Sequence, residues 1–168
     1  MKQSSGRTSD SSRNAIPIKR ILIPIDFSEH SKNALRYAIP FAKQFDAELL
    51  LVYVVEPTIY PADLSFGQIG IPSLEPELRQ RGKEELERLV EKQIAGQVRA
   101  KTTIRTGKPF IEIIETAKQE HIDLIIIATH GHTGVEHILF GSTAEKVVRK
   151  APCPVLVVRP ANIDDTPV

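Results

Sequence analysis

The chain has almost no cysteine and no tryptophan. Cys153 is the single cysteine among 168 residues. It cannot form an intramolecular disulfide, and its place between Pro152 and Pro154 lacks the spacing of a metal or redox motif. The composition therefore excludes a disulfide scaffold and a cysteine zinc site, and it favours a reducing, cytoplasmic location.

An excess of charge of one sign is also missing. The 22 Lys and Arg residues nearly balance the 21 Asp and Glu residues, which gives a formal net charge of +1. Nucleic acids and anionic membranes usually attract a strongly basic surface, so neither is an expected partner. No apolar stretch approaches the ~20 residues needed to cross a bilayer, and residues 1–19 lack the apolar core of a signal peptide.

Length and composition predict one globular domain with a substantial core, since 41% of the residues are hydrophobic. Residues 1–18 are polar and show no apolar periodicity, so we expect a flexible N-terminal tail. The domain is expected to cover residues 19–160. The polar residues 161–168 form a second expected tail.

Within the domain, apolar runs typical of buried strands alternate with amphipathic, helix-like segments. The expected strands are 20–25, 47–55, 98–106, 123–128 and 154–158, and the expected helices are 28–45, 77–94, 109–117 and 141–150. Strict alternation predicts an α/β fold, a single doubly wound parallel sheet of the flavodoxin or Rossmann type with helices on both faces. Periodicity does not choose the strand order. Residues 56–76, rich in proline, read as a long surface loop that could act as a lid.

Two places carry candidate chemistry. Asp26 ends the first strand, where a carboxylate can hold a ribose hydroxyl, hold a metal ion through water, or cap the following helix. Residues 129–140 contain Gly131 and Gly134, and Gly141–Thr143 then opens a helix whose free amides can receive phosphate oxygens. The alternative is that these glycines only turn the chain and that Ser142 only caps the helix.

The same loop contains three histidines, His130, His132 and His137. They lack the ligand spacing of a zinc site, so we expect no metal ligands here and interpret the histidines as donors beside a phosphate. Ser142 has no nucleophile-elbow motif, and no catalytic residue is assigned.

Four segments together resemble the universal stress protein family, in its nucleotide-binding branch, over residues 19–159. They are Ile21-Leu-Ile-Pro-Ile-Asp-Phe-Ser28, Ala47-Glu-Leu-Leu-Leu-Val-Tyr-Val-Val55, residues 128–142 and Ala151-Pro-Cys-Pro-Val-Leu-Val-Val158. That branch carries a G-x-x-G-(nine residues)-G-[ST] loop. This chain has Ala128-x-x-Gly131, nine residues, then Gly141-Ser142, so alanine replaces the first glycine.

The resemblance implies a Rossmann-like sheet, similar to the adenine nucleotide alpha hydrolases, with strand order 3-2-1-4-5. It also implies a bound adenine nucleotide, ATP or else AMP or ADP, with Mg2+ as an optional companion. The implied binding residues run from the adenosine side to the phosphates: Pro24, Ile25 and Asp26 bound the adenosine; Leu49 lies beside the adenine; Ile127 and Ala128 lie near the ribose; His130, Gly131 and His132 lie on the route to the phosphates; Gly141, Ser142 and Thr143 receive them.

By the same resemblance, the chain is expected to be an ATP-binding, dimeric, cytoplasmic stress-response sensor or regulator that acts on an unidentified protein partner. Two copies would pair through the last strand, 154–158, whose apolar edge invites pairing. One alternative is a dimeric interaction module that binds no nucleotide, for which Ala128 is the best argument. The other is a slow ATPase or phosphoryl transferase, although the P-loop lysine is absent, and a dedicated enzyme is not expected.

Overall fold

The computed structural model describes residues 16–57, 74–129 and 141–159. Strands and helices alternate through these segments as the sequence predicts. Their bounds are β1 Arg20–Pro24, α1 Glu29–Phe45, β2 Glu48–Val55, α2 Glu75–Gln93, β3 Ala100–Thr106, α3 Pro109–Gln119, β4 Leu124–Ala128, α4 Ser142–Lys150 and β5 Val155–Val158.

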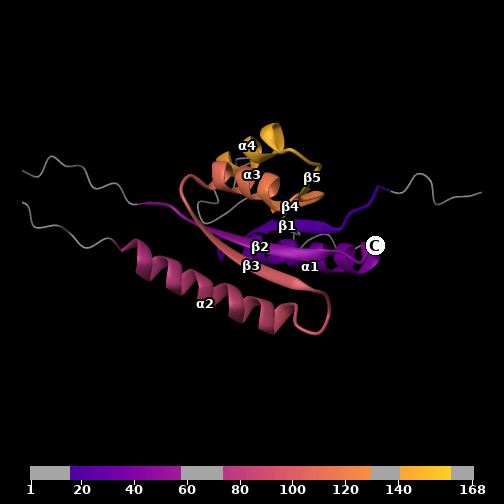
Figure 1. The fold of residues 1–168 in the computed structure, drawn as a ribbon, viewed down its shortest axis with the longest axis horizontal. Helices are drawn as coiled ribbons and strands as arrows, with labels where there is room; N and C mark the ends of the chain where they lie inside the picture. The colour runs from indigo at the N-terminus through magenta and orange to yellow at the C-terminus, as the bar shows by residue number, and fades with distance from the viewer. Residues whose placement is uncertain (1–15, 58–73, 130–140, 160–168) are drawn as a thin grey trace, which may run out of the picture.

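The strands form one parallel sheet in the order β3-β2-β1-β4-β5, which confirms the fold class and the expected strand order. Figure 1 shows α3 and α4 on one face of the sheet and α2 on the opposite face. Because β1 lies between β2 and β4, the winding direction reverses beside it. In open α/β sheets, ligands bind at the carboxyl ends of the strands at this reversal.

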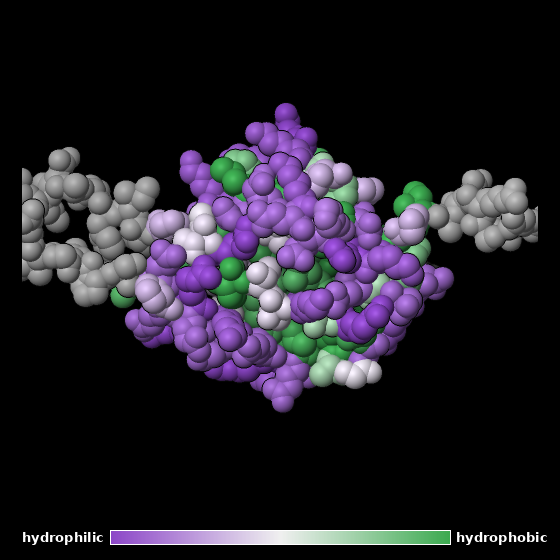
Figure 2. Space-filling view, viewed as in Figure 1, coloured by the Kyte–Doolittle hydropathy of each residue, from purple (hydrophilic) through white to green (hydrophobic). Residues whose placement is uncertain are grey.

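The two faces of the sheet carry separate halves of the core. Odd-numbered residues of β1, such as Ile21 and Ile23, pack with α1 and α2, whereas Leu22 packs with α3 and α4. β4 is buried along its whole length, as expected of a strand with both faces covered. Figure 2 shows hydrophilic residues over most of the visible surface, with hydrophobic ones emerging near its centre.

Helix α1 begins where the sequence predicts. Ser28 is the N-cap and its side chain accepts a hydrogen bond from the Ser31 amide. The helix continues through Pro40 and ends at Asp46, which takes the left-handed conformation with φ 51°. Pro40 is exposed, so the hydrogen bond that its ring removes is lost on the solvent side of the helix.

The two edge strands of the sheet differ in chemistry. On β3, Lys101 and Arg105 form ion pairs with Glu48 at 3.1 Å and Glu112 at 3.3 Å. On β5 the sequence is Val-Leu-Val-Val, and its first three residues are half-buried. β5 pairs only with β4 among the described residues, so its other edge remains open there.

Three element boundaries differ from the expected ones by two residues, including the end of α3 at Gln119 where residue 117 is expected. Glu75 and Pro76, expected in the long loop, form the first turn of α2, where proline is well tolerated because the first amides need no intrahelical acceptor. β3 begins at Ala100, two residues later than expected. Most of the expected lid and the loop with the three histidines lie outside the described residues. Among the helices that the structure describes, none is long and apolar enough to cross a membrane.

Candidate functional site

A cavity of about 480 Å³ opens at the carboxyl edge of the sheet, at the reversal beside β1. Its size is typical of small-molecule sites. The described residues that line it are Pro24, Ile25, Asp26, Phe27, Ser31, Val52, Tyr53, Val54, Val55, Glu56, Leu78, Pro109, Ile113, Ile127, Ala128, Thr129, Gly141, Ser142, Thr143 and Ala144.

One side of the cavity is aliphatic. Pro24 lies beside Val52 in the sheet register, and Val54 and Ile127, each one residue before the end of a neighbouring strand, lie on the same face. Ile113 of α3 completes this surface, which we call the aliphatic wall. It presents no hydrogen-bonding side chain, so it suits the flat face of an apolar or aromatic group.

Asp26 lies next to the aliphatic wall, in the turn between β1 and α1. Its Oδ1 accepts hydrogen bonds from the Ser28 amide at 3.0 Å and from Ser28 Oγ at 2.6 Å. Ser28 is therefore the N-cap of α1, and Asp26 holds the Ser28 side chain in position by accepting its hydrogen bond. Asp26 also lines the cavity, so anchoring Ser28 and facing a ligand are compatible roles for the same carboxylate.

The first turn of α4 forms the polar end of the cavity. Gly141 is the N-cap and its amide donates to the Thr129 carbonyl at 2.7 Å. The amides of Ser142, Thr143 and Ala144 follow, and the first amides of a helix have no intrahelical acceptor. They are oriented toward the helix N-terminus, where the helix dipole favours an anion.

The opposite side of the cavity carries an aromatic pair. The rings of Phe27 and Tyr53 lie with centroids 4.7 Å apart and planes tilted by 48°. Phe27 has φ 64°, a left-handed conformation that costs an L-residue about 1–2 kcal/mol. Partial burial raises the pKa of the Tyr53 hydroxyl, and the nearby carboxylates Glu85, Asp26 and Glu56 raise it further.

Charge at the cavity is negative in the part of the chain that the structure describes. Asp26 and Glu56 are the only charged residues among the described lining residues. A phosphorylated ligand would therefore be held by helix amides and hydroxyls on these elements, and a counterion would reduce its repulsion from the two carboxylates. Within the described segments, no group of three His, Cys, Asp or Glu side chains is placed to hold a metal ion by itself.

Most of the predicted binding residues come together here. Those that line the cavity are Pro24, Ile25, Asp26, Ile127, Ala128, Gly141, Ser142 and Thr143. Their role in binding stays a prediction. His130, Gly131 and His132 lie outside the described residues.

The placement of Leu49 beside an adenine is not supported and is corrected. Leu49 is fully buried near the amino end of β2, paired with Ile21 and Ala100, and it is not among the residues that line the cavity. Val52 and Val54, toward the carboxyl end of the same strand, line the cavity instead. The early position of Leu49 in its strand already indicates this, because the ligand edge of a parallel sheet lies at the carboxyl ends of its strands.

Ala128, which replaces the expected glycine, presents its methyl group away from the aliphatic wall. It pairs in register with Val158, which belongs to the core on the α1 side of the sheet. Side chains alternate along a strand, so Ala128 and Ile127 point to opposite faces. Only 7% of the Ala128 residue is exposed, although it lines the cavity.

Comparison with known proteins identifies the family of this chain. The model of the universal stress protein family matches residues 17–159. The chain is 40% identical over 144 residues to universal stress protein MJ0531 of Methanocaldococcus jannaschii, covering 84% of this chain and 82% of that protein. The chain belongs to the universal stress protein family.

Solved structures share the fold. Universal stress protein UspA from Lactobacillus plantarum has a TM-score of 0.71 and 30% identity, covering 87% of this chain and 100% of that one. A universal stress protein from Archaeoglobus fulgidus in complex with dAMP has a TM-score of 0.59 and 20% identity, covering 85% of this chain and 98% of that one. The second likeness concerns the fold alone.

Proposed function

We propose that this protein binds an adenine nucleotide in the cavity beside β1. The observation that carries the proposal is the division of one cavity into an aliphatic wall and a polar end, with Asp26 also lining it. A nucleotide has the matching sequence of groups: a flat base, a sugar with hydroxyls, and phosphates.

In this arrangement the base lies against Pro24, Val54 and Ile127. The Asp26 carboxylate accepts hydrogen bonds from ribose hydroxyls while Ser28 holds it in position. The amides of Ser142 and Thr143 receive phosphate oxygens at the N-terminus of α4. Mg2+ would neutralise part of the phosphate charge in a cavity where the charged groups of the described lining residues are the carboxylates of Asp26 and Glu56.

The proposal is for binding and signalling and not for a dedicated enzyme. Among the described lining residues there is no Lys or Arg to stabilise charge on a transferring phosphoryl group. We further propose a cytoplasmic homodimer that pairs through β5 and offers a different surface to a protein partner when nucleotide is bound. The apolar edge of β5, which no described strand pairs with, supports the dimer, and the dAMP complex of the Archaeoglobus fulgidus relative supports the capacity of this fold for adenine nucleotides.

The first experiment is to denature freshly purified protein and identify any released nucleotide by chromatography and mass spectrometry. Titration calorimetry with Mg-ATP, Mg-ADP and AMP on nucleotide-free protein then gives the affinities. Val54→Trp, which fills the aliphatic wall, and Asp26→Ala should each weaken binding at least tenfold.

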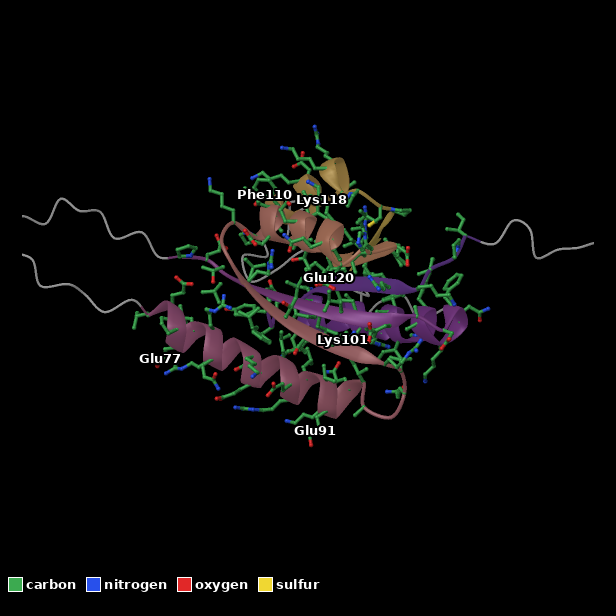
Figure 3. The ribbon with its side chains drawn as sticks, in the orientation of Figure 1. Glu77, Glu91, Lys101, Phe110, Lys118 and Glu120 are labelled. Carbon is green, nitrogen blue, oxygen red and sulfur yellow. The ribbon has the colours of Figure 1, made fainter. Side chains whose placement is uncertain are left out.

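Glu91→Ala is the matched control, because Glu91 lies on α2 and points away from the sheet (Figure 3). Its affinity should equal that of the unaltered protein. A protein that is purified without nucleotide and binds none of the three ligands would overturn the proposal and leave the dimeric interaction module as the better description.

A further inference from the structure

We propose that Gly82, in the interior of α2 and outside the cavity, is a positioning residue for Asp26. It acts through the rings of Tyr53 and Phe27. Gly82, the two rings and the Asp26 carboxylate follow one another as a line of neighbouring groups, which we call the packed column. This inference rests on the proposed nucleotide site and names a residue that the site itself does not contain.

The column begins at the turn that carries Asp26. Asp26 Oδ1 accepts two hydrogen bonds from Ser28. Phe27, with φ 64°, is the one residue that separates Asp26 from Ser28 in the chain. The peptide planes on both sides of Phe27 therefore set where the carboxylate lies. A left-handed aromatic residue persists only when its surroundings hold it in place.

The Phe27 ring packs against the Tyr53 ring. The two ring centroids are 4.7 Å apart, within the range of a favourable aromatic pair. Tyr53 sits on β2, whose register with β1 is fixed by a run of paired residues from Arg20 to Pro24. Tyr53 itself is paired with Ile104 of β3, so neighbouring strands hold its backbone on both sides, and a displaced Tyr53 ring would push on the Phe27 ring that it contacts.

Gly82 lies directly against the Tyr53 ring. A Cβ atom added at Gly82 would lie 2.6 Å from Tyr53 Cε1, closer than any real contact, so the ring rests directly on the helix backbone. Ile104 Cδ1 of β3 would lie 3.7 Å from the same added Cβ atom, so a side chain at residue 82 would face both β2 and β3. Glycine is unfavourable in a helix interior, and here it makes the space that the ring occupies.

The decisive test is a double-mutant cycle on the full chain, with AMP and Mg-ATP affinities measured by calorimetry. Gly82→Ala should weaken binding about tenfold, because a displaced Phe27 turn misplaces Asp26, although alanine favours the helix. In a Tyr53→Val background, which removes the ring atoms near Gly82, the same Gly82→Ala change should alter affinity less than twofold. Glu91→Ala on the outer side of α2 is the control for helix substitutions and should change nothing (Figure 3).

A second measurement does not depend on nucleotide. In NMR spectra of ligand-free protein, the backbone amide chemical shifts of Phe27 and Ser28 should change in Gly82→Ala and stay unchanged in Glu91→Ala. Unmoved resonances together with unchanged affinity would overturn the inference, and so would an equal loss of affinity with and without the Tyr53 ring. If the unaltered protein binds no nucleotide, the proposed function fails, and the resonances alone decide whether Gly82 positions the turn.

Discussion

Leu49 and Val54 lie five positions apart on β2 and belong to different environments. Leu49 is fully buried against Ile21 of β1, whereas Val54 lines the cavity at the carboxyl edge of the sheet. Side-chain alternation also places them on opposite faces of the sheet. Core stability and ligand contact are therefore separable along a single strand.

Substitutions at these two positions should affect different properties, stability at Leu49 and nucleotide affinity at Val54. Leu49→Ala is expected to lower the free energy of unfolding by about 2–5 kcal/mol, because it leaves a cavity in the core, while nucleotide affinity of the folded protein changes little. Val54→Trp is expected to weaken affinity at least tenfold with a smaller loss of stability. Urea unfolding and calorimetry measure the two quantities, and a large loss of affinity in folded Leu49→Ala would restore Leu49 to the site.

Restoring the family glycine should do little to binding. Ala128→Gly is expected to change nucleotide affinity less than threefold, since the methyl group lies on the opposite face from the aliphatic wall. It should lower stability by about 0.5–1 kcal/mol, as glycine does within a strand. A marked gain in affinity would show that the methyl group does obstruct the ligand.

The strand-helix alternation could be predicted from the sequence because buried parallel strands such as β4 are unbroken apolar runs. The strand order could not, since periodicity records burial and not neighbours, and the order came from the family resemblance. Asp26 and Gly141 were found through their place at element ends. Phe27 and Tyr53 were missed as lining residues because their roles depend on a turn conformation and a cross-element contact that no local pattern records.

The N-cap of α1 should matter for both stability and binding. Ser28→Ala removes the acceptor for the Ser31 amide and the hydroxyl that donates to Asp26. We expect a loss of about 1 kcal/mol in unfolding free energy and a severalfold loss of nucleotide affinity. Ser28→Thr, which keeps the hydroxyl, should recover most of both, and failure to recover affinity would indicate that the hydroxyl does not position Asp26.

Alkaline pH should destabilise the protein through Tyr53. Burial raises the pKa of its hydroxyl above the ordinary value of 10.0, so the neutral phenol is favoured in the folded state. This contribution is complete below pH 10 and is lost as the pH rises through the folded-state pKa. Urea unfolding as a function of pH should show a smaller alkaline loss in Tyr53→Phe, and identical profiles would contradict the assignment.

The open edge of β5 should form the dimer interface. Val157→Lys is expected to yield monomers in sedimentation or light scattering, because it places a charge on an apolar edge. Thr103→Lys on β3 is the matched control at the other edge and should leave the dimer intact. A dimer that survives Val157→Lys and also survives Val155→Lys would place the interface elsewhere.

The unlike chemistry of the two edges bears on how far association can go. If both edge strands of the sheet, β3 and β5, were apolar, each added copy would expose another strand able to pair, and head-to-tail pairing would produce open-ended filaments. Lys101 and Arg105 on β3 would confront like charges in a second β3 strand and require desolvation against β5. A dimer that pairs only through β5 would be isologous and would close after two copies, so the charged β3 edge would limit assembly to the dimer.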